Sequence, residues 1–249
     1  WDWQAMTHAA ESPPTPRAIN MNRIGAALNG EADDPPLKSL YVFNANPVSS
    51  SSNSAAIVRG LQRDDLFTVV HELFMTDTAQ FADIVLPATT QLEHTDLHKG
   101  YGHRFLQYNA AAIAPRGEAR SNWDTMRSLA TAMGYTEPWL HAEVDEIIAE
   151  VLDASRAGNP ALGCTTLEQL QEQGTVPYTM AEAPHDVPYH GGVFPTPSGR
   201  IDLYSTAMLE QGQPPLPTYV PLPTPSSPDT LALLSGAAHH YVSSSMANL

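Results

Sequence analysis

The chain has 249 residues, 42% of them apolar, so it is long enough for one large domain or for one domain and part of a second. Twelve basic residues stand against 27 acidic ones, and the resulting net charge of -15 would repel nucleic acid and anionic membranes. The single cysteine, Cys164, excludes an internal disulfide framework and any zinc or iron–sulfur site built from several cysteines of this chain. No apolar run approaches the roughly 20 residues that a membrane-spanning helix needs.

The first 38 residues are rich in Trp, Pro and Ala and contain one candidate helix, at residues 20–29. The doublet Pro35-Pro36 ends this segment. We therefore interpret residues 1–38 as the tail of a preceding domain or as a linker.

A strand–helix–strand pattern begins at Ser39. Residues 40–43 are a short apolar and aromatic run, residues 53–63 have apolar side chains at helical spacing, and residues 67–70 form a second β-rich run. The whole pattern takes about thirty residues, which is the size of a βαβ unit. Such a unit crosses over right-handed, so its two parallel strands end at the same edge of the sheet.

Four further elements follow in the sequence. They are a third buried strand at 84–86 that Pro87 stops, a strand at 105–108, a helix at 121–133 with Ser121 as N-cap and Gly134 as its stop, and a helix at 144–152. Beyond Ser155 the pattern weakens, and residues 212–228 hold seven prolines, which indicates a linker or an extended strap. A new apolar run then begins at Leu231.

Polar residues follow the first strand, where loops of an open α/β sheet reach ligands. Asn44 and Asn46 offer amides, and Ser49 to Ser52 offer hydroxyl and N–H groups ahead of a helix N-terminus, a place that favours anions. The alternative is a turn with a helix cap, because Asn, Pro and Ser are ordinary turn residues.

His71 and Glu72 follow the second strand at the same predicted edge. A carboxylate there can accept hydrogen bonds from the N1–H and the amino group of a guanine base. The string HELFM lacks the second histidine of the HExxH motif, so it does not indicate a zinc protease. The alternative is a solvated glutamate at a strand end.

The histidines His94, His98 and His103 follow Glu93 and suggest a metal cluster, because the first two are spaced by four. Glycines at 100 and 102 and the lack of a helical apolar pattern argue against the helix that such a site would need. We therefore predict no metal ligands among these residues.

Five strings of the sequence together resemble the molybdopterin oxidoreductases of the dimethyl sulfoxide reductase family. In chain order they are LYVFNANPVSS, RDDLFTVVHELFMTDTAQFADIVLPATTQLEH, GEARSNW, FPTPSGRIDLYS and LLSGAAHHYVSSSMANL. The block from Thr76 through Ala79 to Asp83 and Pro87 carries the family's ADxxLP pattern. The resemblance covers most of residues 20–249 and is greatest to formate dehydrogenase-like and other anaerobic dehydrogenase-type members, so we expect an internal-to-C-terminal fragment.

The resemblance implies a fold and a domain order. The family's third domain is a doubly wound α/β unit that binds the guanosine part of one molybdopterin guanine dinucleotide, and its fourth is a β-barrel. We therefore expect an α/β fold with a doubly wound, mostly parallel sheet and flanking helices, followed by a Pro-rich linker and the first strand of a barrel. The expected boundaries are 1–38 for the preceding tail, 39–155 for the α/β domain, 156–228 for the extension and linker, and 229–249 for the start of the barrel.

The resemblance also implies a set of cofactor-binding residues. They are Asn44, Asn46, His71, Glu72, His94, Asn122, Ser235, His239, His240, Ser243 and Ser244. His94 stands where relatives commonly have lysine. The family's molybdenum ligand comes from an earlier segment, and the N-terminal iron–sulfur cysteines of many members are absent here.

The implied cofactor is molybdenum bis(molybdopterin guanine dinucleotide), held only in part by this chain, with an iron–sulfur cluster expected in the missing N-terminal part. The chain alone should be inactive. Expected partners are the remaining domains of the enzyme and an electron-transfer subunit, without nucleic acid and without membrane insertion. We expect a cytoplasmic location, with a periplasmic one left open; substrate and electron partner are not given by the sequence.

Two other functions stay open at this stage. One is a non-catalytic α/β module that binds a nucleotide or a protein partner. The other is a nicotinamide-dependent enzyme, but no G-x-G-x-x-G follows the strand at residues 40–43, so the dinucleotide fingerprint is missing.

Overall fold

The computed structural model describes residues 17–31, 35–158, 162, 165–177, 189 and 191–221, together with five single positions between 229 and 239. The chain divides into two compact units. One comprises Trp1–Thr179 with Tyr241–Leu249, and the other comprises Met180–His240. Each is described here by itself.

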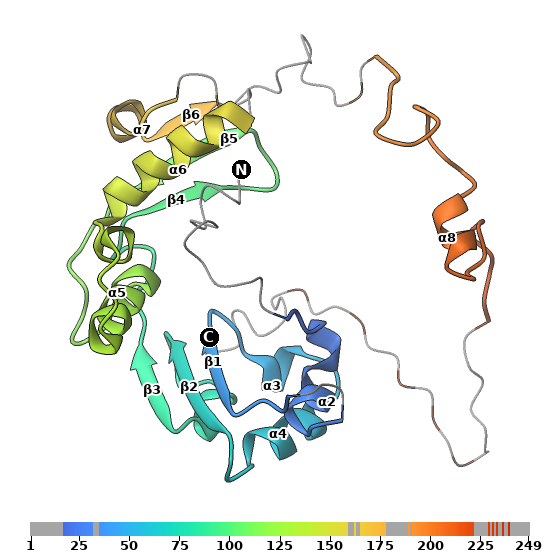
Figure 1. Ribbon diagram of the computed structural model, residues 1–249, viewed down its shortest axis with the longest axis horizontal. Coiled ribbons are helices and arrows are strands. Elements are labelled where there is room, and N and C mark those ends of the chain that lie inside the picture. The colour runs from blue at the N-terminus through green and yellow to red at the C-terminus, as the bar shows by residue number, and fades with distance from the viewer. Residues whose placement is uncertain are drawn as a thin grey trace. The chain divides into compact units, whose positions relative to one another are not determined.

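The first unit contains a three-stranded parallel sheet in the order β1-β2-β3 (Figure 1). Its strands are β1 (Ser39–Phe43), β2 (Phe67–Glu72) and β3 (Ile84–Pro87). The register places Phe43 beside His71 and Glu72 beside Pro87, so all three strands end at one edge. The predicted βαβ unit and the mixed α/β class are confirmed.

One face of this sheet is covered by the helices α2 (Ile24–Leu28) and α4 (Ser54–Leu61). Leu28, Ile57 and Leu61 form a buried cluster there, and Leu40 of β1 packs against it. The two helices approach closely at Gly60, where a Cβ would lie 2.4 Å from that of Leu28. The predicted helix in the N-terminal segment is thus confirmed, and it packs in the core of the sheet unit.

Short helical turns precede or join these elements. They are η1 (Met21–Arg23), α3 (Pro47–Ser50) and η2 (Ala79–Phe81). The sequence predicted that the serines after β1 lie in an open loop. This prediction was wrong for Ser49 and Ser50, which belong to α3. Asn53 caps α4 through its side chain, which accepts from the N–H of Ala56.

The third strand differs from the prediction. It was expected to be buried, but Ile84 is 44% exposed and Val85 is 36% exposed. The reason is its place at the edge of the described sheet, with β2 as its one pairing strand there. The described strands run in one order without a reversal, so a doubly wound arrangement stays a prediction.

A second, antiparallel sheet lies further along the same unit. It contains β4 (Asp96–Lys99), β5 (Phe105–Asn109) and β6 (Thr175–Pro177), with the helices α6 (Val144–Gly158) and α7 (Leu167–Gln173). Leu106, Leu152 and Leu170 are at most 1% exposed and form its core with Ile148 and Val176. The predicted strand at 105–108 and the helix at 144 are confirmed, while β4 and β6 were not predicted.

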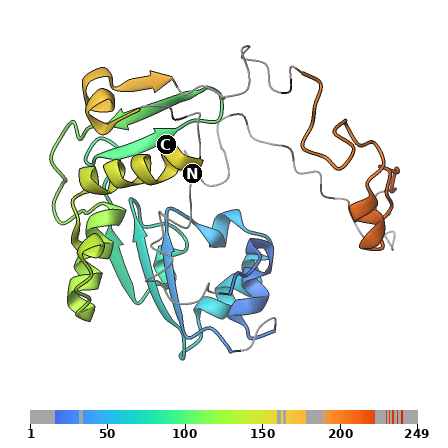
Figure 2. The same ribbon diagram turned by 45° about the horizontal axis from the view of Figure 1, so that its top comes forward.

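Helix α5 (Asn122–Met133) is capped as the sequence predicted. The Ser121 hydroxyl accepts from the N–H of Asp124 at 3.0 Å, and Gly134 ends the helix with a φ of 78°. Figure 2 shows α5 on the opposite side of the parallel sheet from α2 and α4. The 3-10 turn η3 (Pro138–His141) follows, and the indole of Trp123 donates to the Ala142 carbonyl at 2.9 Å.

The second unit contains one short described helix, α8 (Thr206–Glu210). Residues 212–221 carry neither helix nor strand in the part that is described. The remainder of the predicted Pro-rich linker and the predicted barrel strand lie mostly outside the described residues. No described helix is long and apolar enough to cross a membrane.

Candidate functional site at the carboxyl edge of the parallel sheet

The three parallel strands end at one edge, called here the carboxyl edge, which comprises Glu72 and the residues directly after β1, β2 and β3. Asn44 and Asn46 follow β1, while Glu72 closes β2. The segment after β3 is joined to residue 120, because the N–H of Arg120 donates to the Pro87 carbonyl at 3.1 Å. The structure thereby brings the start of α5 to the same edge.

Asn44 is exposed and has a φ of 50°, in the left-handed region. A side chain with a Cβ adopts this conformation at a cost, and asparagine tolerates it better than most residues do. Sparsely populated backbone conformations gather at ligand-binding and active sites. The conformation is therefore compatible with a ligand contact at Asn44.

Asn46 joins two loops of the carboxyl edge. Its Oδ1 accepts hydrogen bonds from the N–H of Thr78 at 3.2 Å and from the Thr78 hydroxyl at 2.7 Å. The same hydroxyl accepts from the N–H of Val48 at 3.1 Å. This structural role occupies the oxygen of the amide, while Nδ2 donates to no group among the described residues.

The serine hydroxyls beside Asn46 are also engaged. Ser49 donates to the carboxylate of Asp77, and Ser50 donates to the Asn46 carbonyl at 2.8 Å. Asp77 also adds a negative charge close to the place where the sequence predicted an anion. These contacts favour a structural role for the two hydroxyls over binding of a phosphate.

His71 and Glu72 are neighbours in sequence but differ in accessibility. His71 is 0% exposed, and its Nε2 lies 3.1 Å from the Arg120 carbonyl oxygen and 3.5 Å from the Thr125 hydroxyl. Its Nδ1 is buried without a hydrogen-bond partner in the described part of the chain. Glu72 is half-buried, and its Oε1 accepts from the N–H of Leu73 at 2.7 Å. Oε2 is therefore the better placed of these groups to meet a ligand.

His94 lies in the loop after β3. Its Nδ1 is 2.8 Å from the Thr89 hydroxyl. Glu93 beside it is buried, and its carboxylate accepts from both the N–H and the hydroxyl of Thr90 and from the N–H of Arg116. The hydrogen bonds from Thr90, and then that from Arg116, hold the pKa of Glu93 below its ordinary value.

The remaining predicted residues lie in different parts of the chain. Asn122 is exposed at the first position of α5. His239 is exposed and belongs to the second unit. Ser235, His240, Ser243 and Ser244 lie outside the described residues. Asn44, Asn46 and Glu72 therefore lie at the carboxyl edge with the buried His71, while His94 lies in the loop after β3 and Asn122 at the start of α5. A ligand role for every predicted residue stays a prediction.

The histidines of the candidate metal cluster have separate surroundings. His98 is on β4, and the ring of His103 packs against that of Phe105 with centroids 5.6 Å apart. Across the described residues no group of three or more His, Cys, Asp or Glu side chains could hold a metal ion.

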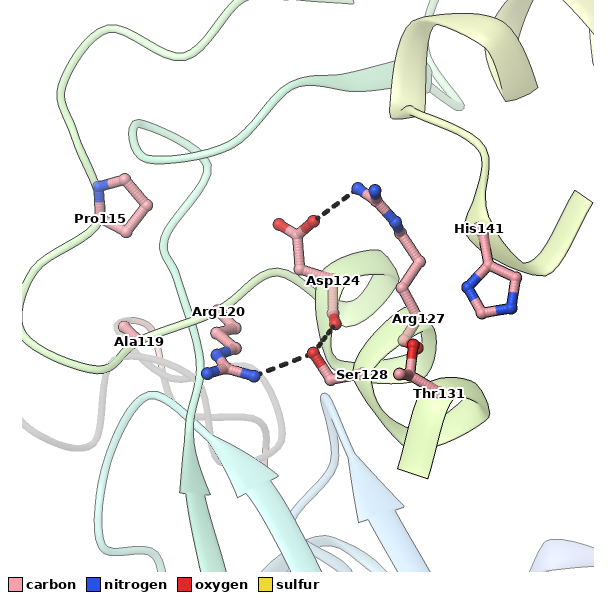
Figure 3. Close-up of a pocket in the computed structure, with 8 residues that line it drawn as sticks. All are labelled: Pro115, Ala119, Arg120, Asp124, Arg127, Ser128, Thr131 and His141. Atoms are coloured by element: carbon pink, nitrogen blue, oxygen red, sulfur yellow. Dashed lines mark hydrogen bonds and ion pairs between the residues drawn. The ribbon is translucent and has the colours of Figure 1, made fainter. Parts of the chain in front are cut away.

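A hollow of about 380 Å³ lies beside α5, close to the carboxyl edge (Figure 3). Its lining residues are Pro115, Ala119, Arg120, Asp124, Arg127, Ser128, Thr131 and His141. Arg127 pairs with Asp124 at 3.4 Å and with Glu143 at 2.6 Å, and Arg120 donates to the Ser128 hydroxyl at 2.9 Å. The two arginines of this hollow are thus already engaged.

The fold brings the loops after three parallel strands to one edge, as in the α/β class of proteins. Residues 5–132 match the molybdopterin oxidoreductase family, and the chain belongs to that family. Membership implies a molybdenum–pterin cofactor, and it disfavours the nicotinamide enzyme and the non-catalytic module.

Several known proteins are similar to the chain. The probable oxidoreductase YoaE of Bacillus subtilis (strain 168) is 38% identical over 94% of this chain and 33% of its own length. The assimilatory nitrate reductase catalytic subunit of the same organism is 27% identical over 76% of this chain and 26% of its own length. The solved structure of acetylene hydratase from Pelobacter acetylenicus matches with a TM-score of 0.60 and 28% identity, over 81% of this chain and 26% of that one. The chain thus spans about a quarter to a third of these relatives.

Proposed function

We propose that this chain is the part of a molybdenum-dependent oxidoreductase that holds the guanosine end of one molybdopterin guanine dinucleotide. The observation that supports this most is the shared carboxyl edge of β1 and β2, with Phe43 paired to His71 in the parallel register. Asn44 and Asn46 after β1 therefore lie at the same edge as Glu72 at the end of β2. Ligands of open α/β sheets bind at such an edge.

The side-chain atoms left unused at the carboxyl edge suit a guanine. Glu72 keeps Oε2 as an acceptor, which is complementary to the N1–H and amino donors of the base. Asn46 keeps Nδ2 as a donor, which is complementary to an acceptor of the base or the ribose. The occupied hydroxyls of Ser49 and Ser50 remove two groups from the expected phosphate contacts, so the base and the sugar are the better match.

The share of this chain in the reaction is binding and orientation. When bound, the molybdenum and its dithiolenes supply the two-electron redox chemistry. We place any iron–sulfur cluster outside these residues, since the chain has one cysteine. We place the molybdenum ligand outside them too, since the resemblance implies an earlier segment for it and the relatives are three to four times longer than the matched part. The chain alone is therefore expected to be inactive, with the rest of the enzyme and an electron-transfer subunit as its partners.

The substrate is not assigned. The relatives carry the names oxidoreductase, nitrate reductase and acetylene hydratase, so similarity within this segment does not select one reaction. A segment that binds the nucleotide end of a cofactor can serve all of them, because it lies at the end of the ligand remote from the metal.

The test replaces Glu72 by alanine in the complete enzyme. Loss of a charged hydrogen-bond acceptor costs about 2 kcal/mol, which corresponds to about thirtyfold weaker cofactor binding. Molybdenum measured by mass spectrometry and guanine nucleotide released on denaturation should therefore both fall. Asp64→Ala is the matched control, because Asp64 is an exposed carboxylate just before β2, at the opposite edge of the sheet. Unchanged loading in Glu72→Ala rejects the proposed role.

A further inference from the structure

The imidazole of His71 lies beside the candidate site but is not accessible from it. His71 is 0% exposed, whereas Glu72, the next residue of β2, is half-buried. The Nδ1 atom of His71 is buried and has no hydrogen-bond partner among the described residues. A ligand could contact this ring only by displacing the protein atoms around it. Any effect of His71 on a ligand therefore passes through a neighbouring group.

The other ring nitrogen of His71 contacts the segment that leads into α5. Its Nε2 lies 3.1 Å from the Arg120 carbonyl oxygen and 3.5 Å from the Thr125 hydroxyl. A carbonyl oxygen accepts hydrogen bonds and cannot donate them, so the ring proton belongs on Nε2. A second proton on Nδ1 would bury a charge and a donor without an acceptor. These surroundings favour a neutral ring that donates from Nε2 to Arg120.

Arg120 pairs with the end of β3 in the manner of a further parallel strand. Its N–H donates to the Pro87 carbonyl at 3.1 Å, and Ala88 and Arg120 form a parallel bridge. The Arg120 carbonyl accepts two hydrogen bonds, one from the N–H of Thr89 at 3.1 Å and one from His71. The bond from His71 thus joins β2 directly to the segment that holds the end of the next strand.

Glu72 depends on this arrangement because its backbone is paired on one side. The register with β1 ends at His71, so Glu72 has no partner on that strand. On the other side Glu72 pairs with Pro87, and its carbonyl accepts from the N–H of Ala88 at 3.1 Å. Arg120 holds this end of β3 in turn. The hydrogen bond from His71 to Arg120 therefore stabilises the backbone that carries the Glu72 carboxylate.

We propose that His71 is a positioning residue for cofactor binding and does not touch the nucleotide. Through its hydrogen bond to the Arg120 carbonyl it fixes the direction in which Glu72 presents its carboxylate to the guanine. An acceptor that is held in place before binding loses less freedom when the ligand binds, so it binds more tightly. The inference rests on the proposed function, since it gives His71 a part in holding the same base.

Two substitutions of His71 in the complete holoenzyme test the inference. In His71→Gln the side-chain amide nitrogen can take the place of Nε2 and keep the donor, while in His71→Asn the side chain is one carbon shorter and the amide lies near the place of Nδ1. Both variants bury an amide, so they are matched in polarity. Guanine nucleotide should leave His71→Gln within about twofold of the parent rate, and it should leave His71→Asn about fivefold faster. The release rate is measured by gel filtration and absorbance, well below the melting temperature of each variant.

The same two substitutions in a Glu72→Ala background separate positioning from stability. If His71 acts through the Glu72 carboxylate, the two double variants should release nucleotide at rates equal within about twofold, because the effects of coupled residues do not add. A fivefold difference that persists in this background overturns the inference. The control for general destabilisation is Val176→Ala, which shortens a buried side chain in the core of the antiparallel sheet. Parent-rate release from this control supports the inference, and faster release overturns it because release then follows stability.

The outcomes also separate this inference from the proposed function. Release from Glu72→Ala at the parent rate counts against the proposed function and against this inference with it. Fast release from Glu72→Ala together with parent-rate release from His71→Asn counts against this inference alone. A structure of the unsubstituted holoenzyme tests the inference without any variant, since Nε2 should lie about 2.7–3.2 Å from the Arg120 carbonyl oxygen, with no cofactor atom within about 4 Å of the ring. A cofactor atom hydrogen-bonded to the imidazole overturns it.

Discussion

The two edges of the parallel sheet use their polar groups differently. At the amino edge, before β1 and β2, Asp65 accepts from Arg63 at 2.9 Å and also pairs with Lys38. These hydrogen bonds, first from Arg63 and then from Lys38, hold the pKa of Asp65 well below its usual range. At the carboxyl edge, Asn46 and Glu72 each have one polar atom engaged and one unused. Asp65 at the amino edge is paired with neighbouring side chains, which indicates a structural role. The carboxyl edge keeps unused donors and acceptors, which suits it to a ligand.

The largest effect should come from substitution of Asn46, because its side chain both joins two loops and keeps one atom for a ligand. Asn46→Ala removes the acceptor of two Thr78 hydrogen bonds and should destabilise the protein by about 1–3 kcal/mol. Asn46→Asp keeps that acceptor, replaces the Nδ2 donor by a second oxygen and adds a negative charge. Urea unfolding should therefore separate the two variants, while cofactor retention should fall in both. Equal stability of Asn46→Ala and the parent protein contradicts the structural role.

A pH titration tests the hydrogen-bonded carboxylate of Glu93. The pKa of Glu93 is lowered in the folded state, so its contribution to stability is present above its ordinary pKa of 4.5 and is lost as the pH falls through the folded value. Urea midpoints should therefore decline on acidification below about pH 4.5 less steeply in Glu93→Gln than in the parent. Parallel curves for the two proteins contradict the assignment.

A substitution at Asn44, which follows β1, distinguishes the role of its backbone conformation from the role of its side chain. Asn44→Gly keeps the left-handed conformation without a Cβ, so stability should change by less than about 0.5 kcal/mol. The amide is nevertheless lost, and cofactor retention should fall. If retention is unchanged, Asn44 serves the turn and not the ligand.

The smallest effect is expected at the amino edge. Asp65→Asn removes an exposed ion pair with two partners, and exposed pairs contribute little to stability. The melting temperature should fall slightly, and it should fall less at high salt. Cofactor loading should stay at the parent level. Reduced loading in Asp65→Asn removes the distinction between the two edges.

Much of the fold could be predicted because it depends on local patterns. Apolar runs predicted β1 and β2, and Ser121 and Gly134 gave the ends of α5. The packing of α2 was missed since it depends on a close approach between Leu28 and Gly60, which are distant in sequence. Strand β4 was missed because Asp96–Lys99 is short and polar.

The candidate site was predictable in its location and not in its detail. The crossover rule for parallel strands predicted that Asn44 and Glu72 share an edge, and the register confirms it. No local pattern indicated that Thr78 would occupy the oxygen of Asn46, that Asp77 would engage Ser49, or that His71 would be fully buried. These facts arise from contacts between loops and decide which atoms remain for a ligand.

The central claim is that a guanine binds at the carboxyl edge, and a structure of the complete enzyme with its cofactor measures it most directly. The account predicts the guanine N1–H or amino nitrogen within about 2.7–3.2 Å of the Glu72 carboxylate, with Asn46 on the neighbouring strand end facing the same nucleoside. A cofactor whose guanines both lie away from the ends of β1 and β2 contradicts it.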